Sequence, residues 1–177
     1  MPSPVAHVGI ALCVYAALGP HKSRPWDRAG LAAAFASVAP DLDLVGGLAW
    51  HHGPTHSLVG AGAIGIAVAW LFRVKDWAAR IAIVLGAVLH VPMDWSTGQP
   101  GAPASFGVPW AWPFSSEKAI AADPWFGAYQ INRPGYLANM FRGEAATFYA
   151  KEAATVALAA GFAWAITSLR RIRTRAP

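Results

Sequence analysis

The chain has 177 residues, of which 55% are hydrophobic and only 13% charged. A soluble domain of ordinary composition carries about 25% charged residues, so this composition argues against one. The single cysteine, Cys13, excludes an intrachain disulfide, and the net charge of +5 leaves nucleic acid or anionic lipid as partners for the basic residues. The length predicts one domain, residues 1–177.

Five apolar runs follow one another along the chain and predict five helices. They cover residues 5–18, 29–38 (resuming at Leu42), 58–72, 78–91 and 153–169. Several are shorter than the roughly 20 residues that a bilayer crossing needs, so a soluble bundle with a buried core is an alternative. Small residues dominate the runs, which is typical of helices that pack closely in membranes. We therefore predict an all-α fold, an integral membrane bundle of about five helices.

The basic residues favour the membrane interpretation over the soluble one. Ten of the fourteen lie between runs one and two, between runs three and four, or after run five: Lys22, Arg24, Arg28, Arg73, Lys75, Arg80, Arg170, Arg171, Arg173 and Arg175. Five alternating crossings would place all ten on one side, which the positive-inside rule makes cytoplasmic. This predicts a multi-pass protein with its N-terminus outside and its C-terminus in the cytoplasm. The basic tail then contacts lipid headgroups, and we expect no nucleic-acid partner.

A long polar and aromatic segment separates the fourth run from the fifth. Residues 95–147 are rich in proline, glycine and tryptophan, too polar to cross a membrane and too aromatic to read as plain disorder. In the predicted topology this irregular segment lies on the outer side. Long segments of this kind often act as lids or binding platforms.

Histidine and aspartate residues gather at the ends of the runs opposite the basic residues. They come from four separate segments: His7, then Asp41 and Asp43, then His51, His52 and His56, then His90 and Asp94. Imidazole and carboxylate groups are the ligands of zinc and other divalent metals. The pattern therefore predicts a metal site at the outer ends of the helices.

The local sequence predicts how some of these side chains are held. His90 and Asp94 are four residues apart, which places them on one helical face, although Pro92 disfavours helix at Val91. Asp41 and Asp43 would point apart on a regular helix, so they share a site only if the helix breaks at Pro40.

The motif PTHS, residues 54–57, predicts the start of a helix, with Thr55 or Ser57 as the cap. Such a cap would fix His56 at the head of the third run. Apolar sequence surroundings make an unpaired charge costly, which strengthens the metal interpretation for His56, His90 and Asp94.

We assign the roles as follows. The principal metal ligands are His56, His90 and Asp94, with Asp41 or Asp43 completing the site or bridging a second metal and His7 as a weaker candidate. The candidate catalytic residues are His51, as general acid or orienting group, and Asp43. Alternative interpretations are a packed histidine at position 7, solvated histidines at 51 and 52, and a helix-end carboxylate at 41.

Four motifs in sequence resemble a known family: PDLD (residues 40–43), HHGPTHS (51–57), HVPMD (90–94) and WPFS (112–115). In this order they are similar to the YdjM-like family of bacterial inner-membrane metal-dependent hydrolases, which has a distant likeness to zinc-dependent phospholipase C. The family's H-R-G-x-T-H-S pattern has arginine where this chain has His52. The resemblance implies a hydrolase in the bacterial inner membrane that uses a divalent metal.

The function that we predict is hydrolysis of a lipid or lipid-linked phosphoester or ester by a metal-activated water, with Zn²⁺ as the metal. A metal or proton transporter is an alternative, but transporters usually carry their polar groups near the midplane and often contain inverted repeats. A non-catalytic membrane scaffold with a structural metal site is a further alternative.

Overall fold

The computed structural model of the protein describes residues 3–20, 24–46, 51–97, 107–126 and 143–173. Its α-helices are α1 (Pro4–Leu18), α2 (Arg28–Val38), α3 (Leu58–Leu71), α4 (Trp77–Val88), α5 (His90–Trp95) and α7 (Gly143–Arg173). Two 3₁₀ segments, η1 (Ala39–Gly46) and η2 (Pro54–His56), lie between α2 and α3. The described residues form no strand beyond one isolated bridge. The predicted all-α membrane bundle is confirmed.

Three stretches are long and apolar enough to cross a membrane: Arg28–Gly46, Trp77–Trp95 and Ala145–Arg173. The apolar helices α1 and α3 are shorter, at 15 and 14 residues. Helix α7 begins at Gly143 and not at residue 153, where the fifth apolar run begins. Its first turns are rich in alanine, glutamate and lysine, which favour helix without being apolar, so an apolar run could not reveal them.

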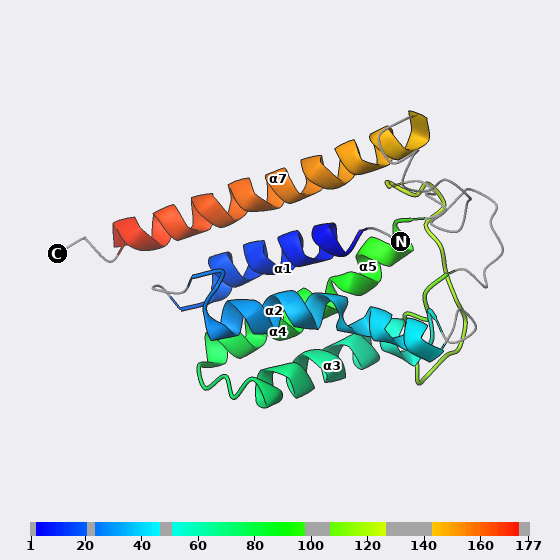
Figure 1. Ribbon diagram of the computed structural model, residues 1–177, viewed down its shortest axis with the longest axis horizontal. Helices are drawn as coiled ribbons and strands as arrows, with labels where there is room; N and C mark the ends of the chain where they lie inside the picture. The colour runs from blue at the N-terminus through cyan, green and yellow to red at the C-terminus, as the bar shows by residue number, and fades with distance from the viewer. Residues whose placement is uncertain (1–2, 21–23, 47–50, 98–106, 127–142, 174–177) are drawn as a thin grey trace.

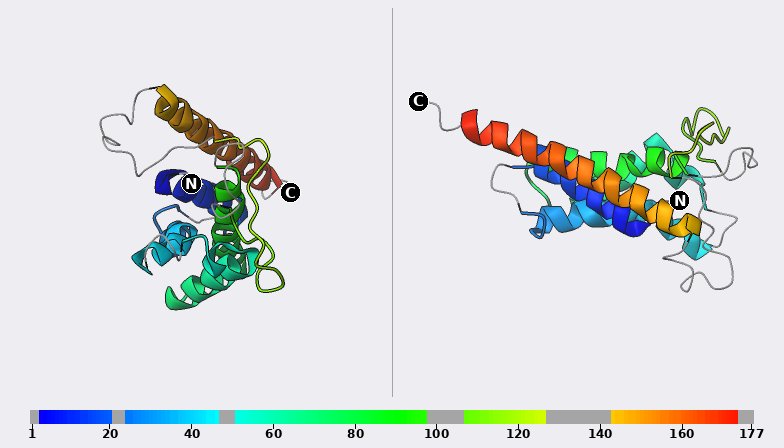
Figure 2. Two further views of the ribbon diagram at one scale, coloured as in Figure 1. Left: turned by 90° about the vertical axis from the view of Figure 1, so that its right-hand side faces the viewer. Right: turned by 90° about the horizontal axis from the view of Figure 1, so that it is seen from above.

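The helices lie side by side, and α7 runs along the outer side of α1 (Figures 1 and 2). Two sets of hydrogen bonds fasten these two helices at opposite ends. Near the N-terminus, Ser3 donates to the Glu152 carboxylate through its backbone N–H and, at 2.7 Å, through its hydroxyl. At the other end, Arg170 donates to the carbonyls of Ala17 and Gly19 at 2.8 and 3.0 Å. These bonds fix the axial position of α7.

The bundle has two chemically different ends (Figure 1). The C-terminal ends of α1 and α7, the start of α2 and the α3–α4 connection meet at one of them, which we call the basic end. The described basic residues on these segments are Arg24, Arg28, Arg73, Lys75, Arg80, Arg170, Arg171 and Arg173. The start of α1, both 3₁₀ segments and α5 lie at the opposite end, the histidine end.

The bundle core is built mainly from alanine. Its largest buried cluster joins α2 to α4 through Ala32, Ala33, Ala36, Ala79, Ala82 and Ala87, with Tyr15 of α1 beside them. The Tyr15 hydroxyl donates to the carboxylate of Asp27, which also caps α2. Small side chains let helix backbones approach closely, as the sequence suggested.

The approach of α3 to α4 gives a testable consequence at Gly65. A Cβ atom there would lie 2.7 Å from the Cα of Val84 and 3.2 Å from the Cβ of Ala87. Backbone cannot yield as a flexible side chain can, so Gly65→Ala should destabilise the protein by about 1–3 kcal/mol. Thermal unfolding in detergent measures this. Gly62→Ala on the same helix has its nearest neighbour at 3.8 Å and should leave the midpoint unchanged; equal midpoints for both variants would contradict the close approach.

The described part of the outer segment, residues 107–126, folds against the histidine end. The backbone N–H groups of Ala121 and Phe126 donate to the carbonyls of Trp95 and Ser96, at 3.1 and 3.0 Å. The Trp110 ring meets Trp95 edge to face, with centroids 5.6 Å apart. The segment is irregular, as predicted, but it ends where α7 begins. Residues 98–106 and 127–142 of the predicted segment lie outside the described residues.

Candidate metal centre

Asp41 reaches the site because the second helix changes its winding. The α-helical part ends at Val38, and a 3₁₀ helix begins at Ala39, next to the predicted break at Pro40. Asp41 and Asp43 then take different positions: Asp41 faces His56 and His90, whereas Asp43 lies beside the outer nitrogen of His56. The break brings both carboxylates to one site, in separate roles.

His56 is held by the start of α3. The Ser57 hydroxyl accepts from the backbone N–H of Gly60 at 2.9 Å and donates to the Pro54 carbonyl at 2.8 Å. Of the two predicted capping residues, Ser57 is therefore the cap, and Thr55 has another task. A Cβ at position 60 would lie 1.9 Å from the Pro54 carbonyl oxygen, so this turn requires glycine. The cap holds the fully buried His56 immediately before the helix.

His90 and Asp94 lie one turn apart on the short helix α5. The helical break falls between Val88 and His90, slightly before the position predicted from Pro92. Pro92 lies in the first turn of α5, where a missing backbone N–H costs little. Both side chains are buried, and Nε2 of His90 lies 3.3 Å from Oδ2 of Asp94. The i, i+4 spacing thus brings these two groups together.

Four donor atoms from three segments surround one point. Nε2 of His56 lies 3.3 Å from both Oδ1 of Asp41 and Oδ2 of Asp94. Nε2 of His90 lies 3.4 and 3.3 Å from the same two oxygens. A tetrahedral zinc site with bonds of 2.0–2.1 Å has ligand-to-ligand distances of about 3.3 Å. The donor spacing fits a divalent metal of this size.

The hydrogen bonding and charge of the cluster also fit a cation. Among the described residues, Oδ2 of Asp41, Nε2 of His90 and both carboxylate oxygens of Asp94 are buried without a hydrogen-bond partner. The ion-pair partners of Asp41 and Asp94 within the described chain are imidazoles, with no lysine or arginine. The Asp41 and Asp94 carboxylates bring two negative charges, which a divalent ion bound by neutral imidazoles would neutralise.

The outer nitrogens of both ligand-type histidines are fixed by other groups. Nδ1 of His90 lies 2.7 Å from the Ser37 carbonyl oxygen, which can only accept, so this nitrogen carries the proton. Nδ1 of His56 lies 3.1 Å from Oδ2 of Asp43. Partners of this kind leave the Nε2 lone pair directed toward a metal and increase its basicity.

Asp43 connects three side chains beside the four donors. It lies 2.8 Å from Nδ1 of His51, accepts from the Thr55 hydroxyl at 2.7 Å, and contacts His56. Burial lowers the pKa of His51, although its hydrogen bond with Asp43 opposes this. Burial also favours neutral His56, but the adjacent carboxylates of Asp41 and Asp94 outweigh it and raise the His56 pKa.

His7 and His52 contact the site through Asp94. The His7 ring stacks on His90 with centroids 4.0 Å apart, and its Nε2 lies 3.4 Å from Oδ1 of Asp94. His52 has a left-handed backbone, with φ of 57°, and its Nε2 lies 3.4 Å from Oδ2 of Asp94. His51, His52 and His56 form a second group whose donor atoms lie within 4.8 Å of one another. Five of the six histidines thus meet at this end.

Sequence reasoning missed two supporting groups and gave little weight to a third. The Ser37 carbonyl has no sequence signal, because any residue supplies a carbonyl. Thr55 was considered only as a helix cap, although its hydroxyl holds Asp43. For His52 only solvation was considered, as an alternative interpretation shared with His51, yet the His52 side chain is only 13% exposed.

Comparison with known proteins shows the family to which the chain belongs. No curated protein and no solved structure matches the chain. The family model described as YdjM inner membrane protein matches residues 1–176. The match covers all the described helices and every residue of the candidate metal centre, and the chain therefore belongs to the YdjM inner membrane protein family.

Proposed function

We propose that the protein is a membrane-bound, metal-dependent hydrolase that acts on a lipid or lipid-linked phosphoester or ester. The observation that carries this proposal is the cluster of Asp41, His56, His90 and Asp94, whose donor atoms all lie within 4.8 Å of one another. These four residues would hold the metal, and Zn²⁺ suits their two imidazoles and two carboxylates. Bound there, a divalent ion would lower the pKa of a water and polarise a phosphoryl or acyl oxygen.

The chain supplies a proton-transfer group beside the cluster. The Asp43 carboxylate accepts a hydrogen bond from Nδ1–H of His51 at 2.8 Å, which assigns the ring proton to Nδ1 and makes Nε2 the nitrogen that would take a proton from water. The His51 and His56 rings meet edge to face, with centroids 4.8 Å apart, so this base adjoins the four donors. In this proposal His51 is the general base and then the general acid, and Asp43 orients it.

The position of the site favours a membrane-bound substrate. The cluster lies at one end of an apolar bundle, and the irregular segment of residues 107–126 folds against the same end (Figure 1). A transporter would need polar groups along its whole path. A structural metal site would need no base beside the donors. The His51–Asp43 pair supplies such a base, which favours a hydrolase.

The test is hydrolysis by detergent-purified protein supplied with zinc. Short-chain phospholipids and carboxylic esters should be cleaved, and a chelator should abolish turnover. His51→Ala should lower turnover per bound metal by about 10²–10⁴-fold, because His51 lies outside the four donors. If metal-loaded protein cleaves none of these substrates, the hydrolase proposal is wrong and a structural metal site is the better interpretation. If turnover is unchanged in His51→Ala, His51 is not the general base.

We further propose that the histidine end faces outward and the basic end faces the cytoplasm. The sorting of basic residues to one end supports this orientation through the positive-inside rule. Alkaline phosphatase fused after Phe126 should therefore be active, and green fluorescent protein fused after Pro177 should fluoresce. Inactive phosphatase after Phe126, or non-fluorescent protein after Pro177 in a chain that is expressed, would contradict the five-crossing topology.

A further inference from the structure

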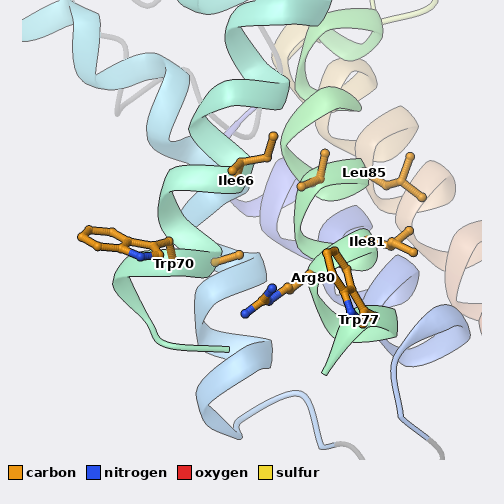
Figure 3. A pocket seen from close by; sticks show the side chains of 8 residues that line it. Ile66, Trp70, Trp77, Arg80, Ile81 and Leu85 are labelled. Atoms are coloured by element: carbon orange, nitrogen blue, oxygen red, sulfur yellow. The ribbon is translucent and has the colours of Figure 1, made fainter. Parts of the chain in front are cut away.

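A groove on the outside of the bundle lies at the basic end, far from the metal centre in the fold. It runs between α3 and α4 and has a cavity volume of about 480 Å³. Its labelled lining residues are Ile66, Trp70, Trp77, Arg80, Ile81 and Leu85 (Figure 3). All of these except Arg80 are apolar or aromatic, and none belongs to the histidine cluster.

The apolar lining is exposed to the surroundings of the bundle. Trp70 is 78% exposed, Trp77 is 71% exposed and Ile66 is 63% exposed. Exposure of this extent is unfavourable in water but normal where a helix faces lipid. Tryptophan rings concentrate at the level of lipid headgroups. The two rings therefore mark where the groove meets the membrane surface, and the aliphatic residues Ile66 and Leu85 continue it toward the hydrocarbon.

Arg80 supplies the charge in this groove. Its guanidinium lies between the two tryptophans in Figure 3, donates through Nε to the Val74 carbonyl at 2.6 Å, and lies 5.0 Å from the Trp77 ring centroid. In the described chain no carboxylate lies within ion-pair distance of it. The adjacent Asp76 instead caps α4 by accepting from Ala79. The terminal nitrogens of Arg80 thus keep donors for an external anion.

We propose that this groove binds an anionic phospholipid from the leaflet at the basic end. The phosphate contacts Arg80, and the acyl chains cover Ile66, Ile81 and Leu85. Exposed Arg73 and Lys75 in the α3–α4 connection add positive charge beside it, which favours a lipid with net negative charge over a zwitterionic one. The proposal is independent of the hydrolase activity, because the groove shares no residue with the metal centre.

The test is native mass spectrometry of the full chain from detergent micelles that contain equal amounts of phosphatidylglycerol and phosphatidylcholine. Wild type should retain phosphatidylglycerol in preference by about fivefold, the effect expected of one well-placed basic residue. Arg80→Gln should remove most of this preference. Arg80→Lys should keep most of it, because the charge remains. Arg173→Gln, also at the basic end but on α7, should keep the wild-type preference.

Three outcomes would overturn the proposal. One is equal retention of both lipids by wild type, and another is equal loss of preference in Arg80→Gln and Arg173→Gln, which would indicate diffuse surface charge. The third is displacement of the lipid by millimolar glycerophosphate, which would identify a phosphate site without a role for the apolar groove. Thermal unfolding of each variant shows whether it is folded, and Arg80→Lys separates lost charge from lost structure.

Discussion

His56→Ala and His90→Ala are each expected to lose most of their bound metal, with affinity falling at least about a hundredfold. Each removes one of four donors, and the remaining three cannot close the shell. Loss of a supporting partner of a ligand typically costs 10–100-fold, so loss of a ligand itself should cost more. Metal content per chain and competition with a chelator measure the effect.

The control for these variants is His21→Ala, the histidine that lies between the first two apolar runs of the sequence, beside the basic residues. It should bind metal as wild type does. Thr55→Val provides a graded comparison, because it removes a hydroxyl that holds Asp43 but no donor of the four. It should weaken binding by about 10-fold to 100-fold. Full metal content in both His56→Ala and His90→Ala, in protein that unfolds cooperatively, would contradict the assigned site.

Asp94→Asn should abolish hydrolysis while weakening metal binding less than Asp94→Ala does. The Asp94 carboxylate lies within 3.4 Å of an imidazole nitrogen from each of four histidines: His7, His52, His56 and His90. The amide keeps the side-chain shape and one oxygen, so a neutral ligand remains. The substitution removes one negative charge that would balance the metal. The net charge of the loaded site then differs from the charge that the reaction requires.

Asp123→Asn is the matched control, since this exposed aspartate lies in the outer segment near the same end of the bundle. It should retain both metal and turnover. Turnover and bound metal are measured on the same preparations, and turnover is expressed per bound metal. Wild-type turnover per metal in Asp94→Asn would show that the charge of Asp94 is not required for the chemistry.

The helices were predictable because their signals are local. The run at residues 58–72 became α3, Leu58–Leu71, and the run at residues 5–18 became α1, Pro4–Leu18. Apolar stretches end where charged loops begin, and Ser57 has the residue type that helix caps prefer. The meeting of Asp41, His56, His90 and Asp94 also followed from sequence, because alternating crossings bring every second helix end to the same side.

The division of roles within the cluster depends on contacts between distant segments, which sequence does not contain. The Ser37 carbonyl reaches His90 only because α2 packs along α4, the helix that leads into α5. Asp43 appeared in sequence as a ligand candidate equal to Asp41, and only the 3₁₀ winding after Val38 separates them. His52 turns toward Asp94 through a left-handed backbone that a residue other than glycine rarely adopts.

The shortness of α1 and α3 has a consequence for the bilayer itself. With 15 and 14 residues they are about 22 Å long, against a hydrocarbon thickness of about 30 Å. In the proposed topology this hydrophobic mismatch is relieved by local thinning. If Trp70, Trp77 and Arg80 anchor the basic end at the interface, as proposed above, the thinning would fall on the histidine end. Headgroups there would lie at the level of His7 and His56, near the starts of these two helices, where a phospholipid would present its ester and phosphate groups to the candidate metal centre without being extracted from its leaflet.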